Sequence, residues 1–190
     1  SSAPTYSRYH DLYVDELDTL YYLVGNKIYQ KPAGGEWSVL ATLPAGYYYI
    51  NGQRDSGGYF NFLAAKKNET SNTGYDIYYM EVLPDGQLLP ETRIASNMNF
   101  DSSSGGGVLR LKDGLIYAVL FSYGNQAYSI YQTQQGEWEY ESLPYADTII
   151  NGEGPLQDPI SGTLHVFGNY DHWMKKTGDN WVDAGDLPGY

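Results

Sequence analysis

The sequence lacks cysteine, has few basic side chains and contains no long apolar run. Its 190 residues include 11 lysines and arginines against 23 aspartates and glutamates, which gives a formal charge of −12 at pH 7. Without cysteine there are no disulfides, thiolate metal ligands or cysteine nucleophiles. Nucleic-acid binding needs a basic surface, so we expect no nucleic-acid partner. No apolar run approaches the roughly 18 residues of a membrane span, so we expect no membrane insertion.

Helical periodicity is also scarce, because glycine or proline interrupts almost every stretch of the sequence. Short segments rich in tyrosine and aliphatic residues recur instead, separated by Gly, Asn, Asp and Pro. Such segments predict strands joined by tight turns. The expected class is therefore all-β, with strands in segments such as 20–24, 47–50, 59–63, 77–82, 115–121 and 164–167.

Short motifs repeat along the chain. Residues 28–30 and 130–132 both read Ile-Tyr-Gln, and residues 35–37 and 136–138 both read Gly-Glu-Trp. Each half divides again, because equivalent places are occupied by Trp37, Leu88, Trp138 and Trp181. The repeat length of about 48 residues is that of a four-stranded propeller blade.

With this organisation the chain resembles β-propeller repeat proteins along nearly its whole length. The Gly-x-x-Trp turns at 34–37 and 178–181 are similar to the end of the sialidase Asp-box, and the Trp…Leu-Pro endings resemble kelch blades. Neither motif is complete, so the resemblance implies the architecture and no subfamily. We expect one four-bladed β-propeller domain that closes within one chain, half of an eight-bladed ring being the alternative. The expected blades are residues 1–46, 47–96, 97–147 and 148–190.

Each repeat is expected to begin with an inner strand, followed by a turn that carries an aspartate. The inner strands are predicted at 11–14, 47–51, 97–100 and 148–151. The turn aspartates are Asp15, Asp55, Asp101 and Asp158. An aspartate at a turn bonds nearby backbone N–H groups, so a structural role is the favoured interpretation. The segment 102–107, Ser-Ser-Ser-Gly-Gly-Gly, is expected to form a flexible turn.

Amide and aromatic side chains provide the candidate ligand site. Inner strands of a propeller line its axis, so the asparagines predicted there would form a polar ring, with Asp11 or Tyr13 as the first-blade counterpart. Some aromatic side chains also exceed what the core needs, and flat rings beside amides are typical of sugar-binding surfaces. The candidate ligand-binding residues are Tyr13, Tyr48, Asn51, Asn99, Asn151 and Trp173.

Motifs for catalysis or metal binding are weak. The chain has no Gly-x-Ser-x-Gly elbow, no histidine spacing typical of metal ligands and no distinctive carboxylate pair, so we predict no catalytic residue. No cofactor is expected. Calcium stays open, with Asp101, Asp179 and Asp183 as weak candidate ligands.

These features favour a non-catalytic, lectin-like binding module whose partner is a glycan or glycoprotein. Its ligand would bind at blade clefts or at the mouth of the axial channel. A self-associating structural protein of an extracellular surface is the first alternative, since aromatic side chains also concentrate at interfaces. A small glycan-active hydrolase is the second. The small-residue start at residues 1–5 would suit a processed, exported protein, so a secreted or cell-surface location is expected.

Overall fold

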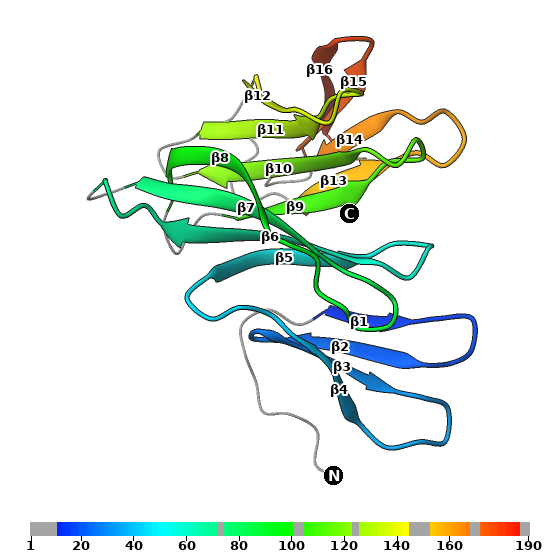
Figure 1. Cartoon of the computed structure of the whole chain (residues 1–190). Helices are drawn as coiled ribbons and strands as arrows, with labels where there is room; N and C mark the ends of the chain where they lie inside the picture. The colour runs from blue at the N-terminus through cyan, green and yellow to red at the C-terminus, as the bar shows by residue number, and fades with distance from the viewer. Residues whose placement is uncertain are drawn as a thin grey trace.

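The computed structural model describes residues 11–71, 74–100, 105–122, 126–144, 153–167 and 172–186. Within these ranges there is no helix, and the strands form four antiparallel sheets of four strands each (Figure 1). Apolar residues at alternating positions, between glycine-rich turns, explain why these segments form strands and not helices. The prediction of an all-β fold is confirmed.

Each sheet is one blade, and its strands follow the order of the chain. Blade 1 consists of β1 (Asp11–Val14), β2 (Leu20–Val24), β3 (Lys27–Lys31) and β4 (Ser38–Thr42). Blade 2 consists of β5 (Tyr48–Arg54), β6 (Phe60–Lys67), β7 (Gly74–Val82) and β8 (Thr92–Asn99). Blade 3 consists of β9 (Gly105–Arg110), β10 (Ile116–Ser122), β11 (Gln126–Gln132) and β12 (Trp138–Ser142). Blade 4 consists of β13 (Glu153–Gln157), β14 (Leu164–Phe167), β15 (His172–Thr177) and β16 (Asn180–Asp186).

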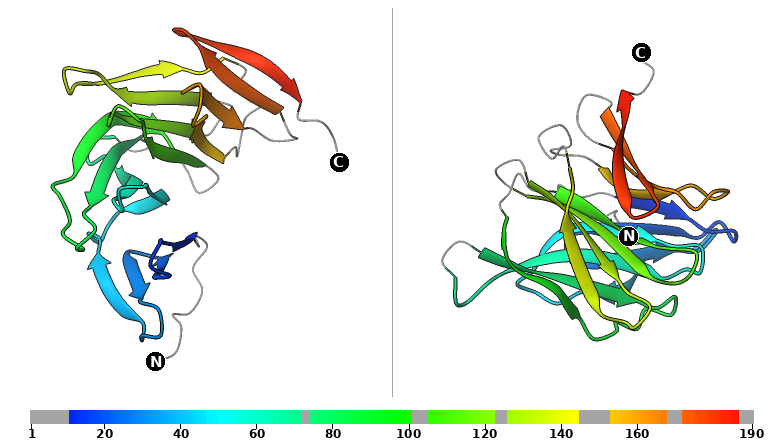
Figure 2. Two further views of the ribbon diagram at one scale, coloured as in Figure 1. Left: turned by 90° about the vertical axis from the view of Figure 1, so that its right-hand side faces the viewer. Right: turned by 90° about the horizontal axis from the view of Figure 1, so that it is seen from above.

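The blades follow one another around an arc, with the first strand of each blade on the inner side (Figure 2). The inner strand β5 lies beside β9, and β9 lies beside β13. A four-bladed β-propeller is therefore confirmed in blade number and topology. The described parts of blades 1 and 4 stand apart at the two ends of the arc, so the expectation that blade 4 meets blade 1 in a closed ring is not met (Figure 2).

Strand β6 shows how the blades pack. All of its first six residues are buried, although side chains alternate between the two faces of the sheet. Phe62 and Ala64 contribute to the apolar cluster shared with blade 1. Leu63 and Ala65 contribute to the cluster shared with blade 3. Blade 2 is thus covered on both faces, and for that reason β6 is apolar at all of its first six residues except Asn61.

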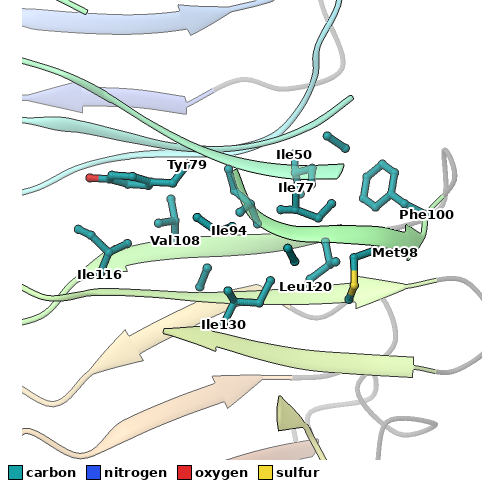
Figure 3. Close-up of a cluster of buried hydrophobic side chains, with 14 residues drawn as sticks. Ile50, Ile77, Tyr79, Ile94, Met98, Phe100, Val108, Ile116, Leu120 and Ile130 are labelled. Carbon is teal, nitrogen blue, oxygen red and sulfur yellow. The ribbon is translucent and has the colours of Figure 1, made fainter. Parts of the chain in front are cut away.

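Three apolar clusters fill the three spaces between successive blades. Figure 3 shows the middle one, where side chains of blade 2, among them Ile77 and Met98, face Val108, Leu120 and Ile130 of blade 3. Full burial of each such aliphatic side chain contributes about 1.5–3 kcal/mol. The packing between blades therefore holds the turns at the ends of the inner strands in fixed relative positions.

The inner strand of blade 3 differs from the prediction. Residues 97–99 end β8, the fourth strand of blade 2, and the inner strand is β9 instead. The glycines at 105–107, predicted to be a flexible turn, belong to this strand. A Cβ added to Gly107 would lie 2.3 Å from the Cα of Gly154 on β13. The two inner strands approach too closely for a side chain, which explains glycine here.

Candidate functional site

A cleft of about 490 Å³ lies between blades 1 and 2, at the ends of their inner strands. Its walls are the β1–β2 turn and the β5–β6 turn, and Pro84 from the connection after β7 closes one side. The lining residues are 13–17, 54–58 and Pro84. A concave site with several polar groups is the usual form of a small-molecule site.

Asp15 fixes the wall contributed by blade 1. Its Oδ1 accepts hydrogen bonds from the backbone N–H groups of Leu17 and Thr19, both at 2.9 Å. Its Oδ2 accepts one from the Tyr21 hydroxyl at 2.9 Å. The Thr19 N–H is the main cause that lowers the pKa of the Asp15 carboxyl below its usual value. Asp15 is therefore a turn aspartate, as predicted, and stays ionised.

Asp55 fixes the opposite wall in the same way. Its Oδ1 accepts hydrogen bonds from the N–H groups of Gly57 at 2.9 Å and Tyr59 at 3.0 Å. Its Oδ2 accepts from Asn61 Nδ2 at 3.2 Å and from Arg110 Nε at 2.9 Å. Both oxygens of each turn aspartate are thus engaged, and the two walls are rigid before any ligand arrives.

Arg54, the last residue of β5, supplies the unused hydrogen-bonding groups of the cleft. Its guanidinium carbon lies 4.4 Å from the ring centre of Tyr21, and Nη2 lies 3.8 Å from Asp15 Oδ2. Only 17% of the side chain is exposed. Its buried Nε has no hydrogen-bond partner among the described residues. The guanidinium is thus held in place by a ring at the cleft wall, and it is bonded less completely than a guanidinium with five N–H donors can be.

Arg110 occupies the same place on β9 and is fully bonded. Besides Asp55, it donates from Nη2 to Glu81 Oε2 and to Asn61 Oδ1, the latter at 3.3 Å. The Tyr79 hydroxyl lies 2.6 Å from both Asn61 Oδ1 and Glu81 Oε2 and completes the cluster. Burial raises the pKa of Tyr79 well above its usual value. The space between blades 2 and 3 is therefore occupied by the protein's own side chains.

Among the predicted ligand-binding residues that the structure describes, Tyr13 alone lines the cleft. Its hydroxyl donates to the carbonyl oxygen of Gly52 at 2.6 Å, across the boundary between blades 1 and 2. This bond orients the half-buried ring at the cleft wall. Tyr13 thus offers an apolar ring edge to a ligand, and its hydroxyl holds the two blades together.

The other predicted ligand residues do not line this cleft. Tyr48 packs edge-on against Phe100, with ring centres 5.5 Å apart, and belongs to the core. Trp173 lies on β15 of blade 4 and stacks on His165 and Phe167, with ring centres 5.0 and 6.2 Å away. Both rings therefore contribute to packing.

The predicted ring of axial amides is not formed as expected. Asn51 lies on the inner strand β5, as predicted, and is half-buried. Asn99 is exposed at the end of β8, a fourth strand, and so does not lie on an inner strand. Asn151 lies outside the described residues.

The predicted calcium ligands do not gather. Asp179 lies in the turn between β15 and β16, and Asp183 lies on β16, where its Oδ1 accepts a hydrogen bond from the Gly185 N–H at 2.7 Å. Asp101 lies outside the described residues. Within the described ranges, no group of three or more His, Asp or Glu side chains is placed to hold a metal ion.

The sequence analysis missed Arg54. A single arginine on a strand belongs to no known motif. Its recurrence in the repeats could have indicated a shared role, because Arg54 and Arg110 both end inner strands. That signal could be read only after β9 had been placed correctly.

No family model and no curated protein sequence matches the chain. Solved structures are similar to it in fold. A protein of unknown function from Bacteroides caccae aligns with a TM-score of 0.66 and 11% identity over 96% of this chain and 64% of that chain. A catalytically inactive virginiamycin B lyase from Staphylococcus aureus, solved with quinupristin, aligns with a TM-score of 0.60 and 14% identity over 93% of this chain and 55% of that one. A thermostable family-43 glycoside hydrolase aligns with a TM-score of 0.53 and 14% identity over 94% and 72%.

At these identities the similarity establishes the propeller fold alone. The chain spans less than two thirds of the length of the first two of these structures. None of the described residues forms a helix long and apolar enough to cross a membrane.

Proposed function

We propose that the chain is a non-catalytic, lectin-like carbohydrate-binding module and that the cleft between blades 1 and 2 is its site. The observation that carries this proposal is the guanidinium of Arg54, held in a cleft of about 490 Å³ with hydrogen-bonding capacity unused. A secreted or cell-surface location belongs to the same proposal and rests on composition.

The chemistry of the lining fits sugar hydroxyls, which both donate and accept hydrogen bonds. Arg54 supplies donors, and the exposed side chains of Ser56 and Glu16 supply a hydroxyl and a carboxylate. Tyr13 and Pro84 supply apolar surfaces against which the C–H groups of a sugar ring can pack. The combination of fixed polar groups and apolar surface is what a sugar ring requires.

Charge selects among sugars. Three acidic side chains, Asp15, Glu16 and Asp55, line the cleft against the single cation Arg54. An anionic sugar would be repelled by the excess of carboxylates, whereas a neutral sugar would not. We therefore expect neutral glycans to be preferred over sialylated or uronic-acid-containing ones.

Binding is favoured over hydrolysis because both aspartates of the cleft are already engaged in hydrogen bonds with the protein. Hydrolysis of a glycoside needs one carboxyl with a raised pKa. The pKa of Asp15 is lowered instead, and both of its oxygens accept hydrogen bonds from the protein. Asp55 is also fully engaged, by its turn and by Arg110.

A self-assembling surface protein is the second candidate. It is favoured by apolar side chains that are exposed on the first and last blades, Leu12 and Leu17 on blade 1 and Leu156 and Ile160 on blade 4. Sedimentation over a range of concentrations distinguishes the two functions, because self-assembly predicts a mass that rises with concentration.

A glycan array tests the proposal. The purified chain and its Arg54→Met variant are applied to the same array, with Arg93→Met as the matched control. Arg93 is a good control because its side chain is 59% exposed on β8, outside the cleft. Saturable binding to one family of neutral glycans by the parent and by Arg93→Met, with loss in Arg54→Met, is expected. Absence of any glycan bound by the folded parent would overturn the proposal.

A further inference from the structure

Successive blades are joined by a repeated pair of charged residues. In the first two spaces, the aspartate that follows the inner strand of one blade faces the arginine that ends the inner strand of the next. Asp55 of blade 2 accepts a hydrogen bond from Arg110 of blade 3 at 2.9 Å. Asp15 of blade 1 lies 3.8 Å from Arg54 of blade 2. The pairing fixes which face of one blade fits the next.

In the third space, both members of the pair are replaced. Leu111 follows β9 where the aspartate would stand, and Gln157 ends β13 where the arginine would stand. Gln157 Oε1 instead accepts a hydrogen bond from the Lys112 N–H at 3.1 Å. Aspartate and arginine are therefore present together or absent together in the three spaces. An isolated charge in a half-buried place is unfavourable, which explains the pattern.

Blade 4 carries the aspartate of a fourth pair. Asp158 follows β13, and its Oδ1 accepts hydrogen bonds from the N–H groups of Ile160 at 2.7 Å and Ser161 at 3.1 Å, as in the turns of blades 1 and 2. Among the described residues, no lysine or arginine lies within ion-pair distance of Asp158. Within the described ranges, Asp158 thus lacks a counterpart of the arginine that pairs with Asp55.

The apolar surface of blade 4 is also left uncovered. Leu156 on β13 occupies the place of Leu109 on β9, which packs into the cluster between blades 3 and 4. Leu156 belongs to none of the three apolar clusters of the described residues and is 51% exposed, and Ile160 in the following turn is 93% exposed. This face therefore has the apolar contact and the aspartate of an interface between blades, but no blade against it (Figure 2).

We propose that the open face of blade 4 binds a further propeller-type blade whose inner strand ends in arginine. The incoming arginine would bond Asp158, and the incoming sheet would cover Leu156 and Ile160. Blade 1 of a second copy does not meet this requirement. Its inner strand ends in Val14, so that contact would leave Asp158 unpaired. The partner is thus a blade from outside residues 11–186, chosen by charge.

The chain itself supplies a probe for this face. Val14 is 57% exposed at the end of β1, so Val14→Arg places an arginine at the required position of an existing blade. The double variant, Val14→Arg with Asp158→Asn, is the protein that donates the arginine. It cannot associate with its own copies through this contact, because its Asp158 is replaced. The wild-type chain is the acceptor protein, which receives the arginine at Asp158. The single variant Asp158→Asn is the matched control acceptor, because its amide oxygen can still accept the hydrogen bonds of the turn. Sedimentation velocity of labelled acceptor with increasing donor measures the complex.

The expected result is a heterodimer that forms about tenfold more tightly with wild-type acceptor than with the Asp158→Asn acceptor. Leu156→Glu in the acceptor abolishes it, and a donor with Val14→Gln in place of arginine weakens it. Far-UV circular dichroism confirms that each variant is folded. Equal binding to both acceptors, no binding at all, or equally tight association of wild-type copies with one another would each overturn the proposal.

Discussion

Arg54 and Arg110 end the inner strands of two successive blades, and only Arg110 forms hydrogen bonds with the aspartate in front of it. Arg110 is bonded by Asp55 and Glu81, so the space around it is filled by the protein. Arg54 rests on the Tyr21 ring at 4.4 Å and lies 3.8 Å from Asp15, and its buried Nε has no hydrogen-bond partner among the described residues. The same position thus serves packing between blades 2 and 3 but lines the cleft between blades 1 and 2.

Substituting the two arginines should affect stability unequally. Arg110→Met leaves the carboxylates of Asp55 and Glu81, which are 12% and 14% exposed, without their cation. We expect a loss of about 2–4 kcal/mol in the free energy of unfolding. Arg54→Met removes two ring contacts, with Tyr21 and Phe60, and one long ion pair, so the loss should stay below about 1 kcal/mol. Urea unfolding measures both, and equal losses would contradict the difference between the two sites.

Acid should destabilise the chain partly through its turn aspartates. Hydrogen bonds from the N–H groups of Ile160 and Ser161 lower the pKa of Asp158 from its ordinary value of 3.8. A carboxyl with a lowered folded-state pKa stabilises the protein above its unfolded-state pKa, and this stability is lost as the pH falls through the folded-state pKa. The urea midpoint of Asp158→Asn should therefore fall less than that of the wild type between about pH 5 and pH 3. Parallel curves for the two proteins would contradict this role of Asp158.

Alanine should be tolerated at one end of β9 and rejected in its middle. A Cβ at Gly107 would lie 2.3 Å from the Cα of Gly154, a backbone atom that can move only with its strand. Gly107→Ala should cost about 2–4 kcal/mol by separating blades 3 and 4. At Gly105 the nearest atom would be 4.0 Å away, on Phe121, so Gly105→Ala is the matched control and should cost less than about 1 kcal/mol. Thermal unfolding of both variants tests the close approach of the inner strands.

Glycan binding at the cleft should not depend on calcium. The carboxylate oxygens of Asp15 and Asp55 already accept hydrogen bonds from the protein, so they are poorly placed to supply the six to eight oxygen ligands that calcium takes. Titration of the bound sugar with and without EDTA should give the same affinity. Loss of binding with EDTA and its recovery with added calcium would show that a metal ion takes part.

Features of the fold that recur between blades were predicted from the sequence more successfully than features found in one blade only. The repeated Ile-Tyr-Gln segments at 28–30 and 130–132 both lie on third strands, β3 and β11. The inner strand β9 was missed because three successive glycines have low strand propensity. Glycine is needed there because β9 packs closely against β13, and this contact can be seen only when the blades are assembled.

The candidate site was less predictable for a related reason. Tyr13 was identified from its place on an inner strand, and it lines the cleft. Tyr48 and Trp173 were chosen as surplus aromatics, but their contacts with Phe100 and His165 belong to packing. Arg54 became recognisable only when Tyr21 and Asp15 of the neighbouring blade were seen around it. Contacts between side chains of different blades cannot be predicted from the sequence motif of one blade.

The measurement that tests the central claim most directly is a calorimetric titration of the best neutral glycan from the array into three proteins. These are the wild type, Arg54→Met and the control Arg93→Met. Loss of one guanidinium's hydrogen bonds to a sugar in a partly buried cleft should weaken binding about tenfold or more in Arg54→Met, because a hydrogen bond to a charged group contributes about 1.5–3 kcal/mol. Arg93→Met should bind like the wild type. Unchanged affinity in a folded Arg54→Met protein would contradict the claim that the cleft between blades 1 and 2 is the binding site.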